Sequence, residues 1–146
     1  MMTVKLCAVT LAGLLAAGLS LSLRGEEGAS VWDAIYTEDQ AKRGEQDYQK
    51  ECAKCHGSQL EGQGRRPPLK GAEFTAYWDG MTVGLLFETM QSAMPGDRPG
   101  QLSTEENADI LAYLLKSNQF PSGGKELVGD IDALRKIRFA AARPEK

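Results

Sequence analysis

The stretch Cys52-Ala53-Lys54-Cys55-His56 decides how the rest of this sequence is interpreted. The pattern Cys-x-x-Cys-His is the attachment motif of a c-type haem. On a helical turn, two thiols three positions apart can each add to one vinyl group of the haem. The adjacent histidine is then held under the iron as an axial ligand. His56 is the single histidine of the chain, so no other imidazole competes for this role.

Two other uses of the motif fit the sequence poorly. A structural zinc site needs about four ligands, and beyond Cys52, Cys55 and His56 the one remaining thiol is Cys7, near the start of the chain. A thioredoxin-type cysteine pair is expected in a βαβ context, and no such pattern surrounds the motif. The sequence therefore predicts one haem c, bound covalently through Cys52 and Cys55.

Residues 1–28 are predicted to be a signal peptide. Lys5 supplies a thin basic region, residues 6–23 are almost entirely apolar, and several small residues offer cleavage sites. The apolar run is also close to the ~20 residues that cross a bilayer, so an uncleaved membrane anchor is the alternative. We expect a periplasmic protein, membrane-anchored if the leader is retained.

The chain of 146 residues is long enough for one domain and carries a formal net charge of −3. This slightly negative net charge does not indicate a nucleic-acid-binding protein. We predict a cytochrome-sized domain at 29–122 and a C-terminal extension at 123–146, joined by the linker-like residues 122–124. No alternating strand pattern is visible, so the predicted fold class is all-α.

Local signals place the helices. Thr37 to Gln40 and Ser103 to Glu106 each form a capping box, and Pro95 ends a further helix that Thr82 can cap. Residues 57–80 are rich in glycine and proline, which predicts a long, functional loop. The predicted helices cover about residues 38–52, 83–92 and 104–116, with a short last one carrying Ile131, Leu134 and Ile137.

Gly44 lies on one face of the first predicted helix together with Ala41, Tyr48 and Cys52. Glycine costs helix stability relative to alanine. Its position on an amphipathic face predicts that another backbone crosses closely there, although a tolerated glycine without a role is the alternative.

Three methionines follow the predicted leader, and one of them is assigned to the other face of the iron. Met90 lies at core spacing on an apolar helical face, which favours packing, and Met81 precedes a helix. Met94 follows a helix end and precedes the rigid Pro95, so we predict Met94 as the second iron ligand, with packing as the alternative. A thioether ligand favours electron transfer, whereas an open face would permit binding or catalysis.

With these pieces in place, the sequence resembles class I c-type cytochromes. Within the class it is similar to small single-haem bacterial cytochromes that partner quinoprotein alcohol or sugar dehydrogenases. The resemblance covers about residues 36–120 and leaves the tail from Gly124 unassigned. It rests on four stretches, Cys52-Ala53-Lys54-Cys55-His56-Gly57, Pro67-Pro68-Leu69-Lys70-Gly71, Ala93-Met94-Pro95 and residues 108–115.

The resemblance implies a small cytochrome c fold of about three to five helices wrapped around one covalent haem. Gly44 on the first helix would cross Ile110 on the last. The Pro67 carbonyl would accept the Nδ1–H bond of His56, which fixes a ligand ring and raises its basicity. Trp78 would either donate to a haem propionate or pack in the core.

The function implied is that of an exported electron carrier rather than an enzyme. It would move one electron at a time from a periplasmic dehydrogenase towards the respiratory chain, as a monomer or small subunit. Its partners would be a donor dehydrogenase and an acceptor cytochrome or oxidase. The alternatives are an obligatory haem subunit of a dehydrogenase complex and an open-site haem protein that binds a small ligand.

Overall fold

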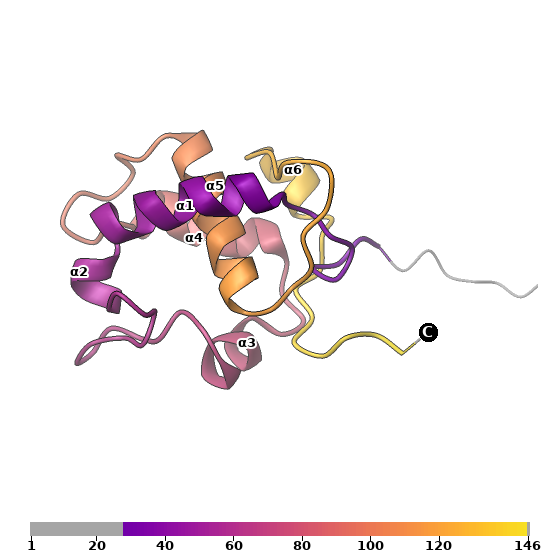
Figure 1. Cartoon of the computed structure of the whole chain (residues 1–146), viewed down its shortest axis with the longest axis horizontal. Coiled ribbons are helices and arrows are strands. Elements are labelled where there is room, and N and C mark those ends of the chain that lie inside the picture. Colours follow the sequence, from indigo (N-terminus) through magenta and orange to yellow (C-terminus); the bar gives the residue numbers. More distant parts are fainter. Residues whose placement is uncertain (1–27, 146) are drawn as a thin grey trace, which may run out of the picture.

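The computed structural model describes residues 28–145 (Figure 1). This part of the chain contains helices and isolated β-bridges but no strand, which confirms the all-α prediction. The predicted signal peptide falls almost wholly outside it. None of the helices at 28–145 is long and apolar enough to span a bilayer. The helices are α1 (Glu38–Glu51), α2 (Ala53–His56), α3 (Ala72–Trp78), α4 (Val83–Ala93), α5 (Thr104–Ser117) and α6 (Ile131–Leu134).

The close crossing predicted at Gly44 is present between α1 and α5. A Cβ atom on Gly44 would lie 1.8 Å from the carbonyl oxygen of Asp109 and 2.9 Å from the backbone nitrogen of Ile110. One turn further along, the rings of Tyr48 and Tyr113 pack with their centroids 5.3 Å apart. Only a residue without a side chain fits here, which explains a glycine in mid-helix.

An ion pair holds the same crossing together. The Arg43 guanidinium donates to both carboxylate oxygens of Asp109, at 2.7 and 3.0 Å, and to Glu126 at 3.0 Å. Asp109 is buried, so its charge needs such a partner. Arg43 therefore joins α1, α5 and the start of the C-terminal extension.

The predicted capping box at Thr37 is only half present. The Thr37 hydroxyl accepts from the Gln40 backbone N–H at 3.1 Å, as expected. The Gln40 side chain does not reach back, so that part of the prediction is wrong. Its buried amide instead donates to the Leu127 carbonyl and accepts from the Leu127 N–H, both at 2.8 Å. The backbone N–H and C=O of one distant residue thus pair with both ends of the buried Gln40 amide.

The second capping box, at the start of α5, is complete. The Ser103 hydroxyl accepts from the Glu106 N–H at 3.1 Å, and the Glu106 carboxylate accepts from the Ser103 N–H at 2.8 Å. These bonds hold the pKa of Glu106 below its ordinary value, the Ser103 backbone bond being the larger cause. A depressed pKa means that this contribution to stability is present above about pH 4.3 and is lost as the pH falls through the folded-state pKa.

Replacing Ser103 with alanine is expected to destabilise the protein by about 1 kcal/mol at neutral pH, because an orphan N–H at the start of α5 loses its partner. Thermal unfolding at pH 7 measures the loss. Ser103→Asp keeps an acceptor and serves as the control. Equal shifts in Tm for the two variants would contradict a capping role for Ser103.

The prediction of one long loop over residues 57–80 needs correction. The segment includes the short helix α3, which follows Gly71 in the left-handed region at φ 86°. Phe74 and Trp78, four positions apart, bury the inner face of α3. The remaining part, before Gly71, is a chain of turns. The glycines and prolines restrict helix length without preventing a helix.

The C-terminal extension packs against the core instead of trailing from it (Figure 1). Leu127, Leu134 and Phe139 are all buried. Gly123 is not part of a free linker, because its N–H donates to the Tyr36 carbonyl at 2.6 Å in a tightly packed turn. The extension is therefore part of the same folded body as α1–α5.

The last helix is shorter than the spacing predicted. α6 ends at Leu134, and Ile137 lies beyond it in a bend that follows the turn at residues 135–136. There Arg138 forms β-bridges with Ser30 on one side and Thr82 on the other. Backbone pairing with these two segments replaces the helical hydrogen bonds that the pattern predicted.

Candidate functional site

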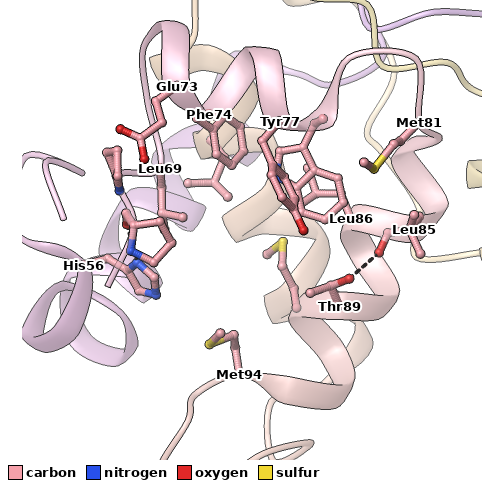
Figure 2. A pocket seen from close by; sticks show the side chains of 15 residues that line it. His56, Leu69, Glu73, Phe74, Tyr77, Met81, Leu85, Leu86, Thr89 and Met94 are labelled. Carbon is pink, nitrogen blue, oxygen red and sulfur yellow. Dashed lines mark hydrogen bonds between the residues drawn. The ribbon is translucent and has the colours of Figure 1, made fainter. Parts of the chain in front are cut away.

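A cavity of about 560 Å³ lies between α2, the turn at residues 67–69, α3 and α4 (Figure 2). Its volume falls within the ~300–1,000 Å³ typical of cofactor and ligand pockets. Polar groups are few on its walls. The larger side chains that form the α3 and α4 walls are Phe74, Tyr77, Trp78, Leu85, Leu86 and Met90.

His56 ends α2 and lines the cavity, with only 6% of the residue exposed. Its Nδ1 lies 3.0 Å from the Pro67 carbonyl oxygen, the contact that the resemblance implied. A carbonyl can only accept, so Nδ1 is the donor, and in the neutral ring with this tautomer Nε2 has the free lone pair. Gly57 ends the helix in the left-handed region, at φ 81°. The local fold thus delivers an imidazole in the tautomer that a metal ligand needs.

Cys52 and Cys55 lie at the junction of α1 and α2, within the turn that ends in His56. Both are partly buried and neither is in a disulfide. They stand beside the cavity and do not line it. Burial raises the pKa of the Cys52 thiol to about 11, which disfavours the thiolate that would begin disulfide formation.

All three methionines of the described chain, Met81, Met90 and Met94, line the cavity. Figure 2 shows the Met94 thioether and the His56 imidazole on facing sides of the open space, with Met81 on the far side near Leu85. Met94 caps α4, and its N–H donates to the Met90 carbonyl at 3.0 Å. Met90 does not pack only in the core, because the apolar face of α4 is also a cavity wall.

Ion pairs fix the loop after Met94 relative to α2. The Lys54 ammonium donates to the Asp97 carboxylate at 2.6 Å, and this hydrogen bond holds the pKa of Asp97 below its ordinary value. Arg98 pairs with the buried carboxylate of Glu51, at the end of α1. The loop that follows Met94 is therefore tied to the segment that carries His56.

Trp78 lies in the cavity wall and is 8% exposed. Its ring packs against Phe74 and Tyr77, with centroids 6.4 and 5.1 Å away. Core packing is thus part of its role, while donation to a propionate stays a prediction.

The sequence analysis missed three residues that line the cavity, Glu73, Leu85 and Thr89. Glu73 belongs to α3, a helix that was not predicted. Leu85 and Thr89 are four positions apart on α4 and flank the apolar stripe of Val83, Leu86, Phe87 and Met90. Extending that stripe by one helical step is the signal that could have identified them.

The residues present fit a covalently bound haem. The cavity offers apolar walls, an imidazole with a free Nε2 and a facing thioether, and two thiols stand beside the imidazole. A soft sulfur and a neutral imidazole are the donor set that haem iron takes in electron-transfer proteins.

Comparisons with known proteins agree with this set of donors. The model of the family described as "Cytochrome C oxidase, cbb3-type, subunit III" matches residues 39–114, which is 76 of 146 residues (114 − 38). A comparison with curated proteins gives no match.

Among solved structures, the chain is similar to the crystal structure of the sulfane dehydrogenase SoxCD from Paracoccus pantotrophus. The sequence identity is 22% and the TM-score is 0.51, over 74% of this chain and 61% of that chain. The chain thus spans less than two thirds of its structural neighbour, and the likeness concerns the fold. With the Cys-x-x-Cys-His motif beside the cavity, the family match shows that this chain is a class I c-type cytochrome of that family, a protein that binds haem c.

Proposed function

We propose that this protein is an exported single-haem carrier that passes one electron at a time from a periplasmic dehydrogenase towards the respiratory chain. His56 and Met94 would be the two protein ligands of its iron. The observation that carries the proposal is their position on facing sides of one apolar cavity (Figure 2). Two soft or neutral ligands leave no open coordination site, which favours electron transfer over substrate chemistry.

The bound haem supplies a reversible one-electron couple at its iron. The chain's own residues set the conditions for that couple. Pro67 accepts the Nδ1–H of His56 and so fixes the plane and the basicity of the imidazole. The Met94 thioether would favour the reduced iron and so raise its potential. Cys52 and Cys55 would hold the haem covalently, and Trp78 would donate to a propionate.

Electron exchange with partner proteins occurs at the rim of the cavity. Tyr77 and Leu85 are large apolar side chains that line the cavity while 67% and 46% exposed. Such exposed apolar groups beside a cofactor suit brief contact with a donor dehydrogenase and with an acceptor cytochrome or oxidase. Export of the carrier is tested by the mass of the protein recovered from the periplasm, which reports leader cleavage and the haem increment together.

A second candidate function is a haem subunit that works only inside a dehydrogenase complex. It is favoured by the shared fold with a chain of SoxCD, which is a dehydrogenase. Purification decides between the two. A free carrier is recovered alone and exchanges electrons with soluble acceptors, whereas an obligatory subunit co-purifies with its dehydrogenase and is inert when separated.

Replacing Met94 with alanine tests the proposed ligand. We expect mass spectrometry to find the covalent haem unchanged, while the methionine-to-iron charge-transfer band disappears and the ferric iron becomes high-spin. The reduction potential should fall by on the order of 0.1 V, within the ~0.8 V over which axial ligands tune haem. The reduced variant should bind carbon monoxide.

Met90→Leu and Met81→Leu are matched controls, because they remove the other two thioethers of the cavity at near-constant volume. Each should cost less than about 1.5 kcal/mol and leave the spectrum unchanged. Loss of the band in either control, with the band retained in Met94→Ala, would transfer the ligand role to that residue. If the wild-type protein lacks the band, the proposal that it is an electron carrier with a methionine ligand is wrong.

A further inference from the structure

The α3 and α4 walls of the cavity are joined by residues 79–82, and the C-terminal extension pairs with this connection. The Gly80 N–H donates to the Phe139 carbonyl at 2.9 Å, and the Phe139 N–H donates to the Met81 carbonyl at 2.8 Å. The Val83 N–H, at the start of α4, donates to the Ile137 carbonyl at 2.9 Å. Three backbone hydrogen bonds thus fix the point where the two walls meet.

The other edge of the same segment is also paired. The Val31 N–H donates to the Arg138 carbonyl at 3.0 Å, and the Arg138 N–H donates to the Ala29 carbonyl at 2.7 Å. Residues 137–139 therefore lie between residues 29–31 and 80–83, with their backbone groups used on both sides. A segment held on two edges has little freedom to shift, because any shift breaks several of these hydrogen bonds at once.

The Phe139 side chain stands directly behind the cavity wall. It is 0% exposed, and its ring makes edge contacts with Phe74 and Phe120 at centroid distances of 6.1 and 5.2 Å. Phe74 itself lines the cavity. One aromatic ring therefore separates Phe139 from the space assigned to the haem.

The extension also holds α4 from outside. A Cβ atom on Gly84 would lie 2.7 Å from the Arg135 backbone nitrogen, so α6 and α4 touch almost backbone to backbone. The Arg135 guanidinium pairs with Glu88 on α4 at 2.6 Å. The helix that ends at Met94 is thus fixed at its N-terminal end by the extension.

We propose that Phe139 is a positioning residue for the haem iron. Its backbone fixes the α3–α4 connection and its ring supports Phe74, so that α4 holds Met94 at a constant place relative to His56. The extension is in this way a part of the redox site that reaches no ligand directly. The proposal rests on the proposed function, because it requires Met94 to be an iron ligand.

The test uses full-length holo-protein with Phe139 replaced by alanine. The covalent haem should stay attached, while the methionine-to-iron band weakens and the apparent affinity of the reduced protein for carbon monoxide rises about tenfold or more. Carbon monoxide binds only the state in which Met94 has left the iron, so its apparent affinity follows the population of that state.

Leu127→Ala is the matched control. Leu127 is a buried side chain of the same extension, but its backbone pairs with Gln40 on α1 and makes no hydrogen bond to residues 79–83. It should lower the Tm and leave both the band and the carbon monoxide affinity at wild-type values. Phe139→Leu keeps an apolar side chain and should lie between wild type and Phe139→Ala; it carries the test if the alanine variant does not fold.

Three outcomes overturn the proposal. In the first, the Phe139 variants lower the Tm but keep the wild-type band and carbon monoxide affinity, so Phe139 only packs. In the second, Leu127→Ala raises the carbon monoxide affinity as much as Phe139→Ala does. Any destabilisation of the extension would then have the same effect, and Phe139 would have no specific role. In the third, Met94→Ala leaves the band in place, and the proposed ligand fails together with the positioning role. The spectrum of Met94→Ala thus shows whether the proposed function or only the proposed role of Phe139 is wrong.

Discussion

Replacing both Cys52 and Cys55 with alanine is expected to give a chain without covalent haem that is largely unfolded. The reason is the size of the cavity. The cavity of about 560 Å³ has apolar walls that the haem would fill, and without it those side chains lose their packing partner and meet water. A typical domain has a stability of only ~5–15 kcal/mol, so the loss of the largest apolar group of the core should unfold much of the chain.

Haem staining, mass spectrometry and far-ultraviolet circular dichroism measure the result. Cys7→Ala is the matched control, because it removes the third cysteine of the chain and should leave haem loading unchanged. A double variant that remains helical and fully loaded with haem would show that neither thiol is needed for attachment.

Gly44→Val is expected to be the most destabilising single substitution in α1. A Cβ atom there would lie 1.8 Å from the Asp109 oxygen and 2.3 Å from its carbonyl carbon, and backbone atoms cannot rotate away. α5 must move, which also strains the paired Arg43 and Asp109. We expect a loss of about 3 kcal/mol or more, although the change in helix propensity from glycine to valine is itself well under about 1 kcal/mol.

Thermal unfolding should show a Tm lower by about 10 °C or more. Gly124→Val is the control, because nothing lies within 4 Å of a Cβ atom at that position. If Gly44→Val shifts the Tm no further than Gly124→Val does, the crossing of α1 and α5 tolerates a side chain and the inference from Gly44 is wrong.

Much of the helical fold could be predicted from the sequence, because helix ends carry local signals. The Ser103 capping box and the Thr82 cap both place their helices correctly. Gln40 shows where local reasoning stops. Its side chain fits a capping box by type and spacing, yet it pairs with Leu127, 87 residues away. No local pattern indicates a partner at that distance.

The motif and the resemblance to a known class predicted the central residues of the site. The residues that form the cavity walls were predicted less completely. His56 and Pro67 make the expected contact, and Met94 lines the cavity. The helix α3 was missed because it has no capping side chain and follows a glycine. Phe139 was missed because the spacing of Ile131, Leu134 and Ile137 predicted a helix that stops before it. Its neighbours in the structure come from two segments far away in the chain.

The pairing of residues 29–31 with residues 137–139 also determines how the protein is oriented when it is fused to another protein or linked to a surface. It brings the two ends of the described chain to the same side, and Figure 1 shows α2 at the opposite end. A fusion partner or an electrode linker joined at either end therefore leaves the molecule far from the helix that carries Cys55 and His56. Attachment at residue 28 or at residue 145 presents that helix outwards, so the protein immobilised through either residue offers the same end to an approaching protein.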